Sequence, residues 1–272
     1  MMKIISIDVG MKHLAYCIFY LETPDCKEYQ VIDWNVIDLC KSKIEHKCFG
    51  CLKNKKPCTK TPSYFKNEKY FCKTHAKKEK FLIPTQNLNK TKLSKMKIKK
   101  LKEFCLEKKY VIPKKAKKQD YLDLITKDLD DNYFEIIKKV DSRTINIVTY
   151  GMRIKEEFEK LLQDHKIDCV LIENQIGPLA LRMKMLQGMI MQHFIENDCT
   201  NIKEISPSNK LKEFTNKKTT YKERKFLSIK VTREIMVSEN YMNKWIEHFN
   251  THKKKDDLAD AFLQGLWFIK NN

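Results

Sequence analysis

The first residues of the chain form an apolar run that carries an acid. Ile4, Ile5, Ile7 and Val9 are β-branched and almost continuous, which predicts a central strand over residues 3–10 that is buried on both faces. Asp8 lies inside this run, and a buried carboxylate is costly unless it is paired or binds a metal. Asp8 therefore either caps the end of a strand or binds a metal, and the choice depends on whether other acids converge on it.

The next two segments predict strands that pair with the first. Residues 13–21 are apolar and aromatic, which predicts a second strand joined to the first by a hairpin. Residues 29–39 alternate apolar and polar side chains, as expected of a third strand with one solvent-facing side. Three strands joined by short turns predict an antiparallel meander with Asp8 on its first member.

The charge of the chain favours a polyanionic partner. Among 272 residues, 54 are Lys or Arg and 35 are Asp or Glu, which gives a net charge of +19. Nucleic acid is the obvious partner, although a general bias toward lysine explains part of the excess. No apolar stretch approaches the roughly 20 residues that cross a bilayer. The first strand begins at residue 3, which leaves no room for a targeting peptide. We therefore expect an intracellular protein without a membrane segment.

The composition changes between about residues 40 and 139, which indicates an insertion into the parent fold. No strand is predicted there, and residues 41–80 contain five possible zinc ligands for four places, namely Cys48, Cys51, Cys58, Cys72 and His75. Cys-x2-Cys and Cys-x2-His pairs suit tetrahedral Zn²⁺, because two side chains that bracket a tight turn can reach one ion. Cys72 and His75 are the firmest ligands, and the choice between Cys48 and Cys51 is open. We expect a structural zinc that stabilises a segment with few aliphatic residues.

Residues 90–131 predict two short helices separated by a loop and a basic run. Their apolar faces have helical spacing and consist of Ile98, Leu101 and Leu106, then Tyr121, Leu122, Leu124 and Ile125. This order is similar to the SAP motif, a small DNA-binding helix–loop–helix module, although the glycine expected in the loop is missing. The resemblance implies phosphate contacts by Lys114, Lys115, Lys117 and Lys118. The alternative is a charged face that is only solvated.

The parent fold resumes with a helix over residues 142–165 and a buried strand over residues 168–175, which again ends in an acid, Glu173. A right-handed helical crossover would place this strand parallel to the first, with Glu173 level with Asp8. A helix over 179–196, a strand over 202–207 and a helix over 221–236 follow. The terminal helix begins near residue 253 and carries Asp257 and Asp260 on one face within a single turn. Helix capping would also explain these two acids.

The four acids together predict a site for hard divalent cations. Carboxylates without nearby Cys or His select Mg²⁺ or Mn²⁺. Two such ions about 3.5–4 Å apart can hold a phosphodiester and promote its hydrolysis. Asp8, Glu173, Asp257 and Asp260 are therefore the predicted ligands of two ions and the predicted catalytic acids.

The order of these elements resembles the ribonuclease H-like superfamily. The local sequences at 6–10, 172–175 and 255–261 are similar to the RuvC branch, closest to the poxvirus-type and fungal mitochondrial Holliday junction resolvases, over residues 1–40 and 141–272. The resemblance implies a mixed five-stranded sheet of order 3-2-1-4-5 flanked by helices, with the zinc-binding and SAP-like regions inserted. It also implies a homodimer that makes paired nicks in a four-way DNA junction, in the host cytoplasm or viral factory of a large DNA virus. A catalytic lysine is implied as well, for which Lys225 is the first choice and Lys210 the second.

Two other functions fit the sequence. One is another ribonuclease H-like nuclease, of the transposon type or specific for RNA. The other is a zinc-containing DNA-binding protein whose acids no longer support catalysis. Cleavage of a four-way junction, compared with linear duplex, flap and RNA–DNA hybrid, separates these alternatives.

Overall fold

The computed structural model describes residues 1–41, 46–85, 88–137, 140–175, 177, 180–215 and 219–272. Pro178 and Leu179, at the predicted start of the helix over 179–196, lie outside these ranges. The chain divides into two compact units, one formed by Met1–Lys41 with Val140–Asn272 and the other by Ser42–Lys139. None of the helices in the described ranges is both long and apolar enough to cross a membrane.

The first unit contains a mixed sheet of five strands. These are β1 (Met2–Asp8), β2 (His13–Leu21), β3 (Gln30–Asp38), β7 (Cys169–Glu173) and β8 (Ile202–Ile205), in the order β3-β2-β1-β7-β8. The first three strands form the antiparallel meander, and β7 runs parallel to both β1 and β8. The predicted fold class and strand order are therefore confirmed.

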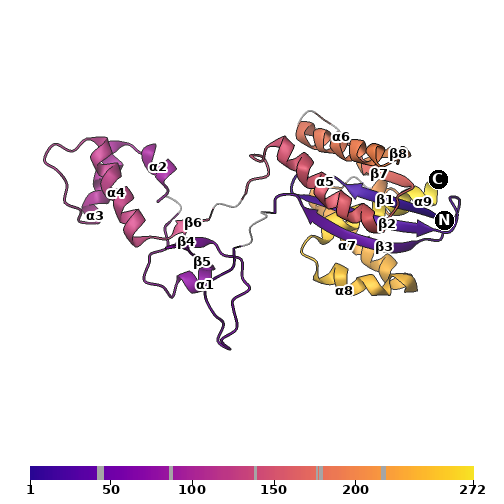
Figure 1. Cartoon of the computed structure of the whole chain (residues 1–272), viewed down its shortest axis with the longest axis horizontal. Coiled ribbons are helices and arrows are strands. Elements are labelled where there is room, and N and C mark those ends of the chain that lie inside the picture. Colours follow the sequence, from indigo (N-terminus) through magenta and orange to yellow (C-terminus); the bar gives the residue numbers. More distant parts are fainter. Residues whose placement is uncertain (42–45, 86–87, 138–139, 176, 178–179, 216–218) are drawn as a thin grey trace. The chain divides into compact units, whose positions relative to one another are not determined.

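Helices cover both faces of this sheet (Figure 1). The helices of one face are α5 (Ile147–Asp164) and α6 (Leu181–Glu196), and those of the other are α7 (Tyr221–Ser238), α8 (Asn243–Thr251) and α9 (Lys255–Asn271). Ile5 and Ile7 belong to the core with α5 and α6, whereas Ile4 belongs to the core with α7, α8 and α9. Strand β1 is thus buried from both sides, as its continuous β-branched run predicts.

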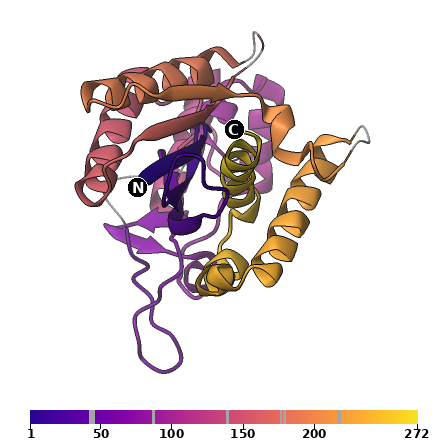
Figure 2. The ribbon, with the colours of Figure 1, turned by 90° about the vertical axis from the view of Figure 1, so that its right-hand side faces the viewer.

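The terminal helix α9 packs closely on the meander, beside β1 (Figure 2). A Cβ at Gly265 would lie 2.2 Å from the ring of Phe19, so only glycine permits this approach. Trp34 donates its indole N–H to the carbonyl of Leu258 at 3.0 Å. The buried Gln264 amide donates to the carbonyl of Ile7 at 3.2 Å. These contacts fix the first turn of α9, with its acids, near the carboxyl end of β1.

Two boundaries and one helix in this unit differ from the prediction. Helix α5 begins at Ile147 rather than at residue 142, because the side chain of Asn146 caps it and accepts a hydrogen bond from the Val148 N–H at 2.8 Å. Strand β8 ends at Ile205, since Pro207 opens a short 3₁₀ helix, η2 (Pro207–Leu211). Helix α8, which follows a second 3₁₀ turn, η3 (Asn240–Met242), was not predicted.

The second unit contains a small sheet that the sequence did not predict. Strands β4 (Tyr64–Lys66), β5 (Lys69–Phe71) and β6 (Glu135–Ile136) have the order β5-β4-β6, and α1 (Lys73–Ala76) follows β5. Asn67 and Glu68 join the hairpin with φ values of 45° and 63°. Two left-handed residues in a row are typical of a type I′ hairpin turn. The expectation of no strand in the insertion is therefore wrong, because strands of two or three residues show no readable alternation.

Three helices, rather than the predicted two, form the rest of this unit. They are α2 (Lys90–Ser94), α3 (Ile98–Glu107) and α4 (Lys118–Asn132). Their core is formed by Leu93, Leu101, Cys105, Tyr121, Ile125, Leu129 and Tyr133. Ile98 and Leu106 were expected in this core, but they are 47% and 58% exposed. The buried stripe of α3 follows Leu101 and Cys105, four residues apart, which turns both of the other side chains toward solvent.

Candidate active site and metal centre

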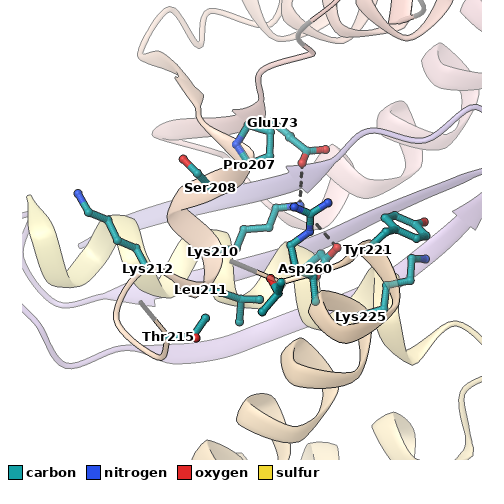
Figure 3. Close-up of a pocket in the computed structure, with 12 residues that line it drawn as sticks. Glu173, Pro207, Ser208, Lys210, Leu211, Lys212, Thr215, Tyr221, Lys225 and Asp260 are labelled. Carbon is teal, nitrogen blue, oxygen red and sulfur yellow. Dashed lines mark ion pairs between the residues drawn. The ribbon is translucent and has the colours of Figure 1, made fainter. Parts of the chain in front are cut away.

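Three of the four predicted acids surround a buried lysine. Parallel pairing of Ile7 with Ile172 ends β1 and β7 at the same level, at Asp8 and Glu173. Lys210 of η2 places its Nζ 2.6 Å from Asp8 Oδ1 and 3.0 Å from Glu173 Oε1. The same Nζ lies 3.8 Å from Asp260 Oδ2 (Figure 3). The predicted convergence of acids from β1, β7 and α9 is therefore present in the structure.

The fourth acid, Asp257, lies in the first turn of α9 and has different partners. Lys254 Nζ is 3.0 Å from Asp257 Oδ2, and Lys225 Nζ is 3.9 Å from Asp257 Oδ1. Lys225 forms its close ion pair with Asp256. Burial raises the pKa of Asp257, and the charges of Asp256 and Asp8 raise it further, so Asp257 lies close enough to Asp8 to interact with it electrostatically. It therefore borders the Lys210 cluster rather than contacting Lys210.

Burial and crowding perturb the acids of the cluster. Burial, reinforced by the charge of Asp8, raises the pKa of Glu173 to about 7, although Lys210 opposes the change. Burial also raises the pKa of Asp260 to about 6, again with Asp8 adding to the effect and Lys210 opposing it. Burial alone would lower the pKa of Lys210, but its three carboxylate neighbours raise it above the ordinary value. One ammonium ion thus leaves excess negative charge in the site, and a divalent cation would neutralise it.

A pocket of about 730 Å³ opens beside the cluster (Figure 3). Its walls include Glu173, Lys210 and Asp260 on the acidic side, and Lys212, Tyr221, Arg224 and Lys225 among its basic and aromatic groups. The pocket therefore combines hard oxygen ligands with groups that can bind a phosphate or stack on a base.

Of the two candidate catalytic lysines, the second choice from the sequence lies nearer to the acids than the first choice. Lys210, the second choice, lies at the centre of the acids and is 5% exposed. Lys225, the first choice, lies at the edge of the pocket, paired with Asp256. Sequence reasoning did not single out Asp256, although its place beside Asp257 was a usable signal. It also missed Gln175, whose amide donates to Glu173 Oε2 at 3.1 Å.

In the second unit, four of the five predicted zinc ligands converge. The ligand atoms of Cys48, Cys58, Cys72 and His75 all lie within 4.8 Å of one another, and all four residues are buried. His75 Nδ1 lies 3.3 Å from Cys48 Sγ and 3.4 Å from Cys72 Sγ. Cys51, by contrast, is exposed. The structure thus brings Cys48 into the cluster and leaves Cys51 out.

Backbone groups orient the histidine of this cluster. His75 donates its Nε2–H to the carbonyl oxygen of Cys51 at 2.9 Å, which leaves the Nδ1 lone pair facing the thiols. A Cβ at Gly50 would lie 2.2 Å from His75 Cγ, so the ring packs directly on the backbone. Burial would raise the pKa of the Cys72 thiol, but hydrogen bonds to its sulfur, above all from the backbone N–H of His75, lower this pKa to about 7. A soft, buried donor set of three thiols and one imidazole fits Zn²⁺.

The predicted DNA-binding lysines lie at the start of α4. Lys114, Lys115, Lys117 and Lys118 are all exposed. Lys117 precedes the helix, and its backbone N–H donates to the Asp120 carboxylate at 2.6 Å. Lys118 Nζ donates to the carbonyl of Ser94 at 2.8 Å. The structure therefore places these four exposed lysines in the first turn of α4 and in the residues just before it.

Comparison with known proteins gives matches over the whole chain. A relative that matches nearly all of this chain is an uncharacterized protein of Acanthamoeba polyphaga mimivirus, 30% identical over an alignment of 319 positions that covers 99% of this chain and 75% of the relative. The fowlpox virus resolvase, solved with its substrate Holliday junction DNA, is 16% identical with a TM-score of 0.44, and 99% of this chain and 97% of that chain are covered. Thermus thermophilus RuvC is 10% identical with a TM-score of 0.42, and the match covers 98% of this chain and 92% of that chain.

A family match completes this comparison. Residues 121–272 match the family described as Poxvirus A22 protein, which is more than half of the chain and includes every strand and helix of the first unit after the meander. The chain therefore belongs to the poxvirus A22 protein family, which confirms the resemblance to poxvirus-type Holliday junction resolvases that the sequence motifs indicated.

Proposed function

We propose that this protein is a structure-selective endodeoxyribonuclease that resolves four-way DNA junctions by metal-dependent hydrolysis of phosphodiester bonds. The observation that carries the proposal is the convergence of Asp8, Glu173 and Asp260 around Lys210, in a chain of the poxvirus A22 family. The fowlpox virus resolvase that this chain resembles was solved with Holliday junction DNA as its substrate.

We assign two divalent cations, Mg²⁺ or Mn²⁺, to Asp8, Glu173, Asp257 and Asp260. The donor set fits these metals because it is made of carboxylate oxygens, whose charge Lys210 alone does not balance. When bound, the ions would activate a water molecule and stabilise the leaving 3′ oxygen.

The chain's own groups position the substrate around this site. Lys210 is held in place by burial and remains charged, so it can stabilise negative charge on the phosphate once metal neutralises its carboxylate partners. Arg224 and Lys225 of the pocket wall can hold the flanking phosphates. Tyr221, which is 65% exposed, can stack on a nucleotide. Of the two lysines, Lys210 is the stronger candidate for the catalytic lysine, since it contacts the acids directly.

A synthetic four-way junction tests this function. With Mg²⁺, the protein should make two symmetric nicks, mapped on all four strands, and should cut linear duplex, flap and RNA–DNA hybrid much more slowly. Glu173→Gln and Asp257→Asn should each abolish cutting and preserve DNA binding. Equal cutting of linear duplex would contradict junction selectivity, preferential cutting of the hybrid would favour an RNA-cleaving enzyme, and binding without any cutting would favour a DNA-binding protein that lacks catalysis.

Symmetric nicking also requires two active sites, and we propose that the protein acts as a homodimer. Each protomer would cut one of two opposing strands of the junction. Light scattering at micromolar concentration, with and without junction DNA, should give twice the mass of the chain in at least one condition. A monomer in both conditions would contradict the proposal. The viral relative and the poxvirus family favour a role in the host cytoplasm or viral factory of a large DNA virus.

We further assign one structural Zn²⁺ to Cys48, Cys58, Cys72 and His75. Metal analysis should find about one zinc per chain. Cys72→Ser should release it, whereas Cys51→Ser, which changes the exposed cysteine next to the cluster, should retain it. A folded protein without zinc, or equal loss in the two variants, would contradict the assignment.

We also propose that Lys114, Lys115, Lys117 and Lys118 contact DNA phosphates, as their likeness to the SAP motif implies. All four are exposed at one end of α4. Replacing them with Gln should weaken binding to duplex arms uniformly across sequences, because phosphate contacts carry no base selectivity. Unchanged binding would instead assign them to a solvated surface.

A further inference from the structure

The positive charge of the chain is concentrated in the inserted unit. Residues 42–139 contain 28 lysines, no arginine and 11 acids, which gives a net charge of +17 out of the +19 of the whole chain. The unit that contains the acidic cluster is therefore close to neutral, with a net charge of +2. A polyanion would be attracted mainly to the inserted unit.

Within that unit, the segment around the cysteine cluster is basic without interruption. Residues 46–66 contain six lysines and no acid. Three of these lysines, Lys53, Lys55 and Lys56, lie in the short loop of residues 52–57 between Cys51 and Cys58, which we term the lysine loop. Every residue of the lysine loop is exposed.

The lysine loop is ordered by its own hydrogen bonds. The Leu52 N–H donates to the Lys56 carbonyl at 2.8 Å, and the Lys55 N–H donates to the Leu52 carbonyl at 3.0 Å. Lys55 adopts a left-handed conformation with φ of 62°, which is unfavourable for a residue with a Cβ. Glycine or asparagine would suit this position better, so the turn holds a lysine side chain outward at a conformational cost.

The cysteine cluster fixes both ends of the lysine loop. At one end, the Cys51 carbonyl accepts the His75 Nε2–H at 2.9 Å. At the other, Cys58 belongs to the cluster, and its N–H donates to the Gly50 carbonyl at 3.0 Å. The cysteine cluster therefore anchors the lysine loop at both ends; Figure 1 draws the described part of the chain between β3 and β4, which includes this loop, as an extended trace without helix or strand.

We propose that the lysine loop binds the phosphate backbone of a DNA arm, as a contact surface separate from the acidic cluster and from the lysines at the start of α4. Three ammonium groups without an intervening acid match the closely spaced charges of duplex DNA. A preordered turn binds with less loss of conformational entropy than a free chain. This inference rests on the proposed function only in taking DNA as the partner.

Lysines elsewhere in the chain provide a matched control. On α5 and α7, Lys155, Lys160 and Lys230 lie 3.7, 2.8 and 3.7 Å from the glutamates Glu159, Glu157 and Glu234. Like the lysine loop, they are exposed, but each already has an acidic partner on the same helix. Replacing these three lysines removes the same total charge from the chain as replacing those of the lysine loop.

The test is the salt dependence of DNA binding by the full-length, zinc-loaded protein, with no Mg²⁺ or Mn²⁺ added so that the DNA stays intact. Affinity for a four-way junction and for a linear duplex is measured from 50 to 200 mM salt. The variants are Lys53→Gln, Lys55→Gln and Lys56→Gln combined, and the control with Lys155, Lys160 and Lys230 changed to Gln. Zinc content is measured for each, and the single variants Lys53→Gln and Lys56→Gln replace the triple variant if it loses zinc.

The slope of log K against log salt is negative, and each lost phosphate contact lowers its magnitude by about 0.9. We expect the magnitude of the slope to fall by up to about 2.7 for the loop triple variant, by about 0.9 for each single variant, and by less than about 0.5 for the control. An unchanged slope in zinc-loaded loop variants, or an equal fall in the control, would overturn the inference and leave an acidic protein as the alternative partner of the loop. If the protein cuts junctions but the loop variants leave the slope unchanged, only this inference is refuted. If the loop variants change the slope as expected but the protein does not cut junctions, only the proposed function is refuted.

Discussion

Glu173 offers a direct test of how the acidic cluster depends on metal. Its side chain is 14% exposed, and burial together with the charge of Asp8 raises its pKa to about 7. The change Glu173→Gln keeps the size of the side chain and removes its charge. Lys210 remains paired after the change, because its Nζ is also 2.6 Å from Asp8. The metal-free protein should therefore become more stable as it loses its activity.

The magnitude follows from the pKa. A carboxyl group whose pKa rises from 4.5 to about 7 on folding destabilises the folded state by about 3 kcal/mol when it is fully ionised. Below pH 4.5 the carboxyl group of Glu173 is protonated in both the folded and the unfolded state, so removing its charge should not change the free energy of unfolding there. As the pH rises from about 4.5 through about 7, Glu173 ionises in the metal-free wild type, and the free energy of unfolding decreases by this amount. Above that range, Glu173→Gln should be more stable than the wild type by about 3 kcal/mol.

Urea unfolding followed by tryptophan fluorescence measures this difference in the relevant unit, since Trp34, Trp245 and Trp267 all lie in the first unit. The proteins are compared at pH 4.5 and pH 8 without added Mg²⁺ or Mn²⁺, and then at pH 8 with saturating Mg²⁺. Metal should stabilise the wild type more than the variant and so reduce the difference. Glu247→Gln, on the exposed side of α8, is the control and should be neutral. A variant less stable than the wild type at pH 8 without metal, or a gain that persists at pH 4.5, would refute the reasoning.

Three further substitutions test other parts of the structure. Lys210→Met should destabilise the metal-free first unit at pH 8, opposite to the effect of Glu173→Gln, because three carboxylates lose their shared cation. Urea unfolding measures the decrease in the free energy of unfolding. Gly50→Ala should weaken zinc binding, since its Cβ would overlap the histidine ring of the cluster, and zinc retention during titration with a competing chelator measures the loss. Gly265→Ala should lower the stability of the first unit by about 1–3 kcal/mol, because its Cβ would overlap Phe19, whereas Gly188→Ala, with open space around it, should be neutral or stabilising in the same urea assay.

The sequence was sufficient to predict the strands that position the acids. The apolar runs before Asp8 and Glu173 are long enough to identify central strands, and parallel pairing brings the ends of the two strands level. The terminal helix was also predictable, because its acids and small residues have helical spacing. The parts of the site that follow from secondary structure alone could thus be derived.

Tertiary contacts decided the parts that the sequence left open. Lys210 reaches the acids because Pro207 ends β8 and begins a 3₁₀ turn, a direction that residue spacing does not specify. The sequence spacing does not choose between Cys48 and Cys51, whereas the folded chain buries the Cys48 thiol in the cluster and leaves Cys51 exposed, with its carbonyl accepting the His75 Nε2–H. The short hairpin of β4 and β5 could have been found from its turn, since Asn67 is a residue type that favours left-handed conformations.

The two units divide the electrostatic requirements of the proposed reaction. A site that holds several carboxylates repels a phosphodiester until metal is bound, and the unit that contains it has a net charge of only +2. In the proposed reaction, attraction of the DNA backbone would then come from the inserted unit, which has a net charge of +17. The metal preferences are divided in the same way, because thiolates and imidazole select Zn²⁺ and carboxylates select Mg²⁺. In the proposed reaction, separate units would let Mg²⁺ exchange at the acidic cluster while the proposed zinc site keeps the inserted unit folded.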